Sequence, residues 1–157
     1  MRFFHITVVS AFGAGFARFA PGTWGTLVGT IILYGLWSFG ALSSPWTLLL
    51  ITAGVTGLSY WSITQLPDNW IHDDQRIVID EVLGLWVTML WVPINWKTLI
   101  LSFILFRLYD IFKPLGIRRF DNLKSDFAVI VDDLVAGVYA NITLQILIVA
   151  LSAYEVW

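Results

Sequence analysis

The chain has 157 residues, of which 58% are hydrophobic and 13% are charged, and its mean hydropathy is +0.78. Soluble domains carry about 25% charged residues, so this composition excludes an ordinary soluble protein and predicts an all-α integral membrane protein. No basic run with interleaved aromatic residues occurs, so no nucleic-acid partner is predicted, and the absence of cysteine excludes disulfides and thiolate sites.

Five apolar segments follow one another along the chain and predict about five transmembrane helices. They cover residues 26–42, 47–63, 77–92, 98–112 and 127–151. A further apolar stretch at residues 3–19 contains Gly13, Gly15 and Arg18, and we expect it to be re-entrant or interfacial. No linker interrupts the chain, so residues 1–157 are predicted to form a single membrane-embedded domain, of unspecified oligomeric state.

The positions of the basic residues predict the orientation of these helices. Lys113, Arg118, Arg119 and Lys124 lie between the fourth and fifth segments, and short loops rich in Lys and Arg stay in the cytoplasm. Counting back through the connections puts four polar stretches at cytoplasmic helix ends, namely PGTWGT, HDDQRIVIDE, FRLYDIFKP and VDDLVAG. These clusters, which are far apart in sequence, are therefore expected to share one membrane face.

Two pairs of adjacent acidic residues lie inside or at the edge of apolar segments. They are Asp80 with Glu81, and Asp132 with Asp133. A charged side chain in a bilayer costs about 3 kcal/mol on insertion scales, so such residues usually bind something, here a cation. The alternative is that they cap a helix or reach water at the interface. Gly84 and Gly137 each follow a pair by one helical turn, where a glycine lets another helix or a ligand approach closely.

Three polar residues form a stripe on the fourth apolar segment. Arg107, Asp110 and Lys113 are spaced three apart, so they lie along one side of a helix. On the functional interpretation Asp110 binds a metal while Arg107 or Lys113 binds an anionic group, because a guanidinium matches the geometry of phosphate. The alternative is an internal ion pair.

The PGTWGT stretch is expected at the start of a helix. Its glycines flank the hydroxyls of Thr23 and Thr26, and a helix start offers backbone N–H donors and a positive dipole end to an anion. The alternative is an ordinary turn. Hard oxygen ligands without cysteine favour Mg²⁺, and carboxylates with arginine suit a phosphate-bearing substrate. The residues thus predict metal-assisted phosphoryl transfer or hydrolysis at a membrane surface.

The order of these motifs resembles the phosphatidylglycerophosphatase A family. The motifs are PGTxGT at 21–26, HD at 72–73 with IVxDExxG at 77–84, FRxxDxxKP at 106–114, and DDxxAG at 132–137. The resemblance covers nearly the whole chain and implies a Mg²⁺-dependent, multi-pass lipid phosphatase of the bacterial inner membrane, with its active site on the cytoplasmic side. Such an enzyme removes the terminal phosphate of phosphatidylglycerophosphate to give phosphatidylglycerol.

The resemblance also assigns roles to individual residues. It implies that Asp80, Glu81 and Asp133 are catalytic, and that the metal ligands come from Asp80, Glu81, Asp110, Asp132 and Asp133. Thr23, Thr26, Arg107 and Lys113 are expected to bind the substrate. Residues 124–128 depart from the family pattern, because they lack the glycines common before the paired aspartates.

A different class of function is the alternative. A non-catalytic membrane transporter or scaffold could also hold a cation at the cytoplasmic face. Such a protein would scatter its acids through the depth of the membrane, whereas the topology predicted here gathers them at one face.

A lipid-modifying transferase could use the same metals. The acid and glycine spacing expected of CDP-alcohol phosphatidyltransferases is, however, absent from this chain.

Overall fold

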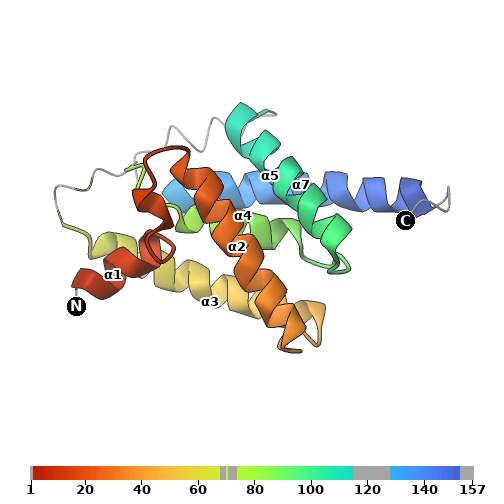
Figure 1. The fold of residues 1–157 in the computed structure, drawn as a ribbon, viewed down its shortest axis with the longest axis horizontal. Coiled ribbons are helices and arrows are strands. Elements are labelled where there is room, and N and C mark those ends of the chain that lie inside the picture. Colours follow the sequence, from red (N-terminus) through yellow and green to blue (C-terminus); the bar gives the residue numbers. More distant parts are fainter. Residues whose placement is uncertain (1, 68–69, 71–73, 115–127, 153–157) are drawn as a thin grey trace.

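The computed structural model describes residues 2–67, 70, 74–114 and 128–152, and every regular element in these ranges is a helix (Figure 1). The elements are α1 (Arg2–Val9), the 3-10 helix η1 (Ala14–Phe16), α2 (Pro21–Ser38), α3 (Pro45–Thr64), α4 (Ile79–Thr88), α5 (Trp96–Phe112) and α7 (Ala128–Ser152). Each of the five predicted apolar segments overlaps one of the helices α2, α3, α4, α5 and α7. The all-α class is therefore confirmed.

Prolines and one asparagine explain where several helices begin. Pro21 and Pro45 occupy the first turns of α2 and α3, where the missing N–H costs no intrahelical hydrogen bond. The Asn95 side chain accepts hydrogen bonds from the backbone N–H groups of Lys97 and Thr98, at 2.9 and 3.1 Å, and so caps α5. Pro45 and Asn95 both lie in predicted breaks between apolar segments, so these boundaries follow from the local sequence.

Helix α4 is the centre of the bundle, and it packs against α2, α3, α5 and α7. Seven of its ten residues are buried. Glycines of α2 allow one of these contacts: a Cβ atom at Gly25 would lie 2.8 Å from Val78, and one at Gly29 would lie 3.1 Å from Val82. The Trp86 indole N–H donates to the Gly29 carbonyl at 3.0 Å. The helix that carries the first acidic pair is therefore fixed from several sides.

A side chain from α7 explains why α4 is short. The Asn141 side-chain amide donates to the backbone carbonyls of Thr88 and Leu90, both at 2.8 Å. These carbonyls lie at and just beyond the end of α4, where helical backbone acceptors lose their partners. Asn141 thus supplies the hydrogen bonds that allow α4 to end inside the bundle.

The prediction of about five transmembrane helices is wrong when the length and composition of each helix are considered. Among the described helices, two are long and apolar enough to cross a membrane, α3 and the Val129–Ser152 part of α7. Ten-residue α4 is about 15 Å long at 1.5 Å per residue, whereas the hydrocarbon core of a bilayer is about 30 Å thick. The apolar segment at 77–92 therefore forms a buried core helix with a turn after it.

The outer surface of the bundle is apolar. Large aliphatic side chains are exposed on several helices, including Ile31 on α2, Leu50 on α3 and Ile146 and Val149 on α7, the last with 71% of its surface exposed. Soluble monomers rarely expose large contiguous apolar patches, so an apolar exterior of this kind marks a surface that contacts something other than water.

The helices alternate in direction, so motifs distant in sequence meet at one end of the bundle. Helices α2, α4 and α7 begin, and α3 ends, toward the left of Figure 1. The end of α5 joins them, because Lys113 contacts Asp132 and Arg107 lies near Glu81. The structure thus gathers the PGTWGT, DE, FRxxDxxK and DD motifs at the same end, as the sequence predicted.

Candidate metal and phosphate site

Three carboxyl groups form the centre of the site. Asp80 and Glu81 come from the first turn of α4, and Asp133 comes from the beginning of α7. One carboxylate oxygen from each residue lies within 4.8 Å of the other two. Asp133 is buried, and Asp80 and Glu81 are half-buried. Adjacent carboxylates repel one another when ionised, so three of them held this close together are suited to hold a cation.

Close contact between α4 and α7 brings these acids together. A Cβ atom added at Gly137 would lie 2.4 Å from the Gly84 carbonyl oxygen, and one added at Gly84 would lie 2.7 Å from the Asp133 carbonyl oxygen. Real side chains do not approach backbone so closely, and glycine therefore sets the spacing of the two helices. Because Gly84 follows Asp80 by one turn and Gly137 follows Asp133 by one turn, the same contact aligns the acids. The close approach predicted for both glycines is confirmed.

The first turn of α2 covers the other side of the acidic group. A Cβ atom at Gly22 would lie 2.1 Å from Glu81 Oε1 and 3.2 Å from Arg107 Nη1. The start of a helix has a positive dipole end, and a carboxylate beside it is stabilised. The PGTWGT stretch is therefore at a helix start, as predicted, and its glycine leaves room for an acid and an arginine.

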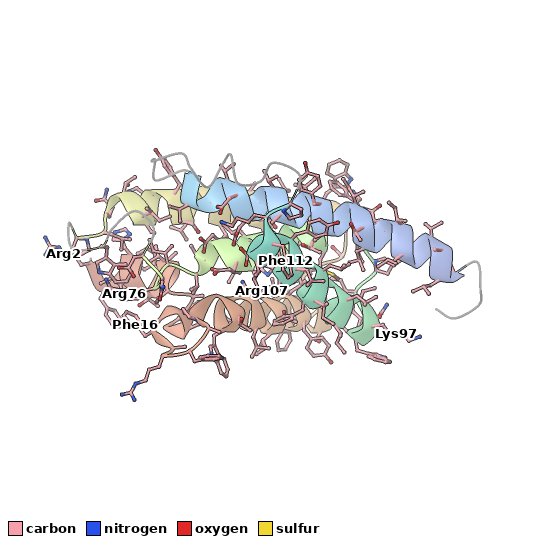
Figure 2. All side chains as sticks on the ribbon, turned by 90° about the horizontal axis from the view of Figure 1, so that it is seen from above. Arg2, Phe16, Arg76, Lys97, Arg107 and Phe112 are labelled. Atoms are coloured by element: carbon pink, nitrogen blue, oxygen red, sulfur yellow. The ribbon has the colours of Figure 1, made fainter. Side chains whose placement is uncertain are left out.

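Arg107 connects the acidic group to α5. Its Nη1 atom lies 2.6 Å from Asp110 Oδ2 and 3.9 Å from Glu81 Oε1, and the side chains of all three residues are at most 16% exposed. Figure 2 shows Arg107 near the middle of the bundle, with Lys97 toward the opposite end of α5. The ion pair with Asp110, which the sequence left as an alternative, is present.

A second ion pair stands beside the first. Lys113 Nζ donates to Asp132 Oδ2 at 2.6 Å. Lys113 caps the end of α5 with a left-handed backbone, φ 42°, which turns the chain out of the helix just before Pro114. Both predicted phosphate-binding cations therefore contact acids in the absence of substrate.

The residues present fit a divalent cation. Five carboxylates and two basic side chains meet here, so ionised acids outnumber the cations. Within the described part of the chain, Glu81 Oε2 and Arg107 Nε are buried without a hydrogen-bond partner. A buried polar atom without a partner is costly unless a ligand or ion supplies one. Oxygen ligands about 2.1 Å from Mg²⁺ lie up to about 4.2 Å apart, close to the spacing of the three carboxylates.

Comparisons with known proteins show the family to which the chain belongs. The family model for phosphatidylglycerophosphatase A matches residues 7–148. The chain belongs to the phosphatidylglycerophosphatase A family. Two similar proteins, from Haemophilus influenzae and Escherichia coli, are named phosphatidylglycerophosphatase A. They are 37% and 36% identical over 88% and 85% of this chain, which correspond to 84% and 77% of their own lengths.

A third relative has a different name. A Bacteroides thetaiotaomicron protein is 39% identical over 92% of this chain and 93% of its own length, and its provisional name is phosphatidylinositol-3-phosphatase. No solved structure matches the chain. Membership of the phosphatidylglycerophosphatase A family therefore assigns the chain to the phosphatase hydrolases, with relatives named for different lipid phosphates.

The two threonines of the family's PGTxGT motif lie in different surroundings. Thr26 is fully buried, and its hydroxyl donates to the Gly22 carbonyl at 2.9 Å within α2. Thr23 is half-buried in the first turn of the helix. Thr23 is thus the more exposed of the two, whereas the Thr26 hydroxyl proton is already used in a hydrogen bond inside the helix.

Phe106 is a site residue that sequence reasoning did not select. Its side chain is fully buried, and its ring lies 2.3 Å from the position of a Cβ at Gly84, so it fills the space between α5 and α4 beside the acids. Its place directly before Arg107 in the FRxxDxxKP motif was the available signal. His72, Asp73 and residues 124–127, which the motif analysis also considered, lie outside the described residues.

Proposed function

We propose that this protein removes the terminal phosphate of phosphatidylglycerophosphate in a Mg²⁺-dependent hydrolysis that yields phosphatidylglycerol. The observation that supports this most strongly is the group of Asp80, Glu81 and Asp133, with ligand atoms within 4.8 Å of one another and the half-buried Arg107 beside it. This arrangement occurs in a chain of the phosphatidylglycerophosphatase A family. A metal and a cation together offset the charge that builds on phosphoryl oxygens during hydrolysis.

The acids divide into two groups in this proposal. Asp80, Glu81 and Asp133 would hold Mg²⁺, which when bound would act as a Lewis acid toward a phosphoryl oxygen and lower the pKa of bound water. Asp110 and Asp132 balance Arg107 and Lys113 before substrate binds. When the phosphate takes these cations as partners, Asp110 and Asp132 become available as further metal ligands or proton acceptors.

The phosphate would be bound by groups from α2 and α5. Arg107 offers a planar guanidinium with an unpartnered Nε, and Lys113 offers a point charge at the end of the same helix. The first turn of α2 adds backbone N–H groups and the Thr23 hydroxyl, while buried Thr26 stabilises that turn. Together these groups orient the headgroup against the acids.

Several features support a site at a membrane surface. We propose that α3 and α7 cross the bilayer, that the apolar exterior contacts lipid, and that short α4 stays enclosed by its neighbours. The active end would face the cytoplasm of a bacterial cell, because the basic loop after α5 belongs to that end. The lipid tails of the substrate would then remain in the bilayer while the headgroup enters the site.

Labelling of single cysteines tests this topology. Ser43 and Gln65 are exposed and flank α3 at opposite ends. The chain has no cysteine of its own, so a cysteine introduced at either position would be the single labelling site. We expect a membrane-impermeant maleimide to label Ser43→Cys from outside intact cells, and Gln65→Cys only after the inner membrane is opened. Labelling of both positions in intact cells would contradict a membrane-spanning α3.

Phosphate release by the purified protein tests the substrate. We expect Mg²⁺-dependent release from phosphatidylglycerophosphate in mixed micelles, at a rate well above that from glycerol phosphate, because lipid tails localise the headgroup at the site. Phosphatidylinositol 3-phosphate is the comparison suggested by the name of the Bacteroides relative. Faster release from that lipid would change the proposed substrate, and no release from any lipid phosphate would refute the proposed hydrolysis.

Arg107→Lys tests the role assigned to the guanidinium. Lysine keeps the positive charge but loses the planar set of donors that can bind two phosphate oxygens. We expect the loss of a hydrogen bond to a charged group to lower kcat/KM about 10-fold to 100-fold. Arg119→Lys, in the basic loop, is the matched control and should leave kcat/KM within about twofold. Equal effects of the two substitutions would remove Arg107 from the phosphate site.

A further inference from the structure

Residues 2–19 form a compact unit on the outside of the bundle. Helix α1 is followed by a tight turn, by η1 and by the entry into α2. We call residues 2–19 the N-terminal hairpin. The sequence predicted a re-entrant or interfacial segment here, and α1 has only eight residues, too few to cross a bilayer.

The hairpin exposes phenylalanine rings. The exposed fractions of Phe3, Phe12, Phe16 and Phe19 are 83%, 77%, 53% and 85%. Phe12 also has a left-handed backbone with φ 59°, between Ala11 at φ 45° and Gly13 at φ 96°. A bulky residue in this conformation costs about 1–2 kcal/mol, and the Phe12 N–H donates to the Thr7 carbonyl at 2.9 Å in this turn. The turn thus holds the Phe12 ring in an exposed position.

The position of the hairpin along α3 identifies the contact. His5 Nδ1 lies 3.2 Å from Ser62 Oγ, and the His5 ring packs edge-on against Trp61 at 4.8 Å. Trp61 and Ser62 are in the last turn of α3, which is one of the two helices able to cross a membrane. Helix α1 therefore lies at the level of one hydrocarbon boundary, where aromatic side chains are favoured.

Charge favours an anionic lipid surface as the partner. No acidic residue occurs in the first 67 residues, and the exposed side chains of Arg2 and Arg18 are next in sequence to Phe3 and Phe19. Figure 2 shows Arg2 at one extreme of the bundle and Phe16 close to Arg76. A basic residue near an anionic leaflet contributes about 1 kcal/mol of attraction, and apolar rings on such a segment enter the headgroup boundary.

The hairpin is also joined to the start of the helix that carries the acids. The Val78 N–H donates to the Val9 carbonyl at 2.9 Å, two residues before Asp80. A Cβ atom at Gly15 would lie 2.0 Å from the Arg76 carbonyl oxygen, so the two backbones touch. Arg76 forms an ion pair with Asp74, and its side-chain hydrogen bond lowers the pKa of the Asp74 carboxyl. The Arg76 guanidinium also lies 4.0 Å from the centre of the Trp70 ring.

We infer that the N-terminal hairpin is a membrane-interface element whose phenylalanine rings enter an anionic lipid surface, and that it fixes the acid-bearing end of α4 at headgroup depth. This inference rests on the proposed function, because it requires that the protein be embedded in a bilayer. It explains why the hairpin exposes its apolar side chains while its backbone contacts the loop before Asp80.

Depth-dependent quenching tests this inference in the full chain. Phe12→Cys and Phe19→Cys would each be labelled with the fluorophore NBD and reconstituted in vesicles of phosphatidylglycerol and phosphatidylethanolamine. We expect a nitroxide near the headgroup to quench both probes more strongly than a nitroxide near the end of the lipid tail. Leu50→Cys, exposed within α3, is the control and should show the reverse order.

The outcomes separate this inference from membrane embedding itself. If Leu50→Cys is quenched but Phe12→Cys and Phe19→Cys are not, the hairpin does not contact lipid, and the inference is overturned while the membrane fold stands. A third outcome is that the hairpin probes are shielded from water, that nitroxide lipids do not quench them, and that their fluorescence changes with the protein-to-lipid ratio. In that case a second copy of the chain covers the hairpin, and the inference is overturned. Absence of quenching at all three positions contradicts the embedding in the proposed function.

Discussion

Asp80→Asn and Asp133→Asn are each expected to lower phosphate release by about 100-fold or more. The amide keeps the size of the side chain but removes the negative charge that a divalent cation needs, and a bound metal supplies several kcal/mol of charge stabilisation during hydrolysis. Each 1.36 kcal/mol corresponds to a factor of ten in rate. The measurement is Mg²⁺-dependent release of phosphate from phosphatidylglycerophosphate by purified variants.

The matched control is Glu155→Gln, which makes the same chemical change three residues after the end of α7. It should retain nearly full activity. Thermal unfolding in detergent should show that all three variants fold. At Asp80 and Asp133 the substitution removes one of several adjacent carboxylates and so relieves repulsion. A rate near that of the parent protein for both Asp80→Asn and Asp133→Asn would show that these acids do not participate in the reaction.

Gly137→Ala is expected to cause a comparable loss by a different route. Its Cβ atom would lie 2.4 Å from the Gly84 carbonyl oxygen and 3.0 Å from the Val87 Cβ, so α4 and α7 must move apart. A displacement of about 1 Å at a catalytic group can cost about 100-fold in rate, and overpacking of this kind destabilises a fold by about 1–3 kcal/mol. Activity and unfolding temperature should therefore both fall.

Gly54→Ala is the control for this substitution, because a Cβ atom at Gly54 in α3 would have nothing within 4 Å. It should leave activity unchanged and should not lower the unfolding temperature, since alanine is the better helix former. Full activity of Gly137→Ala would show that the spacing of α4 and α7 does not control the acidic group.

The location of the site could be predicted from the sequence, because it depends on local patterns. Acids inside apolar segments indicate a bound ligand. A glycine one turn after each acidic pair indicates close approach of another helix or a ligand. Basic residues after α5 indicate the cytoplasmic end of the helices. Alternating helix directions then required the motifs to meet at one end. The contacts at Gly84 and Gly137 agree with that reasoning.

The partners within the site could not be predicted in the same way. Which acid faces Arg107 and which faces Lys113 depends on the rotation of α5 against α4 and α7, and apolar periodicity does not determine that rotation closely enough. The sequence therefore grouped all five acids as metal or catalytic residues. In the structure Asp110 and Asp132 each pair with a cation, whereas Asp80, Glu81 and Asp133 form the group of three.

The number of membrane-spanning helices was overestimated for a related reason. Hydropathy measures how apolar a segment is, but not whether lipid or protein surrounds it. The segment at 77–92 is apolar because α4 is buried by its neighbours, and it ends early because Asn141 on α7 caps its carbonyl groups. A hydrogen bond between residues about fifty positions apart leaves no local signal in the sequence.

We propose that Asp80, Glu81 and Asp133 bind a divalent cation next to the phosphate of a lipid. Electron paramagnetic resonance of Mn²⁺, used in place of Mg²⁺ with a non-hydrolysable phosphonate lipid, tests it most directly. We predict a protein-bound Mn²⁺ signal with coupling to the ³¹P nucleus, displaced by excess Mg²⁺ and strongly weakened in Asp133→Asn. A preparation that hydrolyses the phosphate lipid but binds no Mn²⁺, or binds it equally well in Asp133→Asn, would show that these acids do not hold the cation.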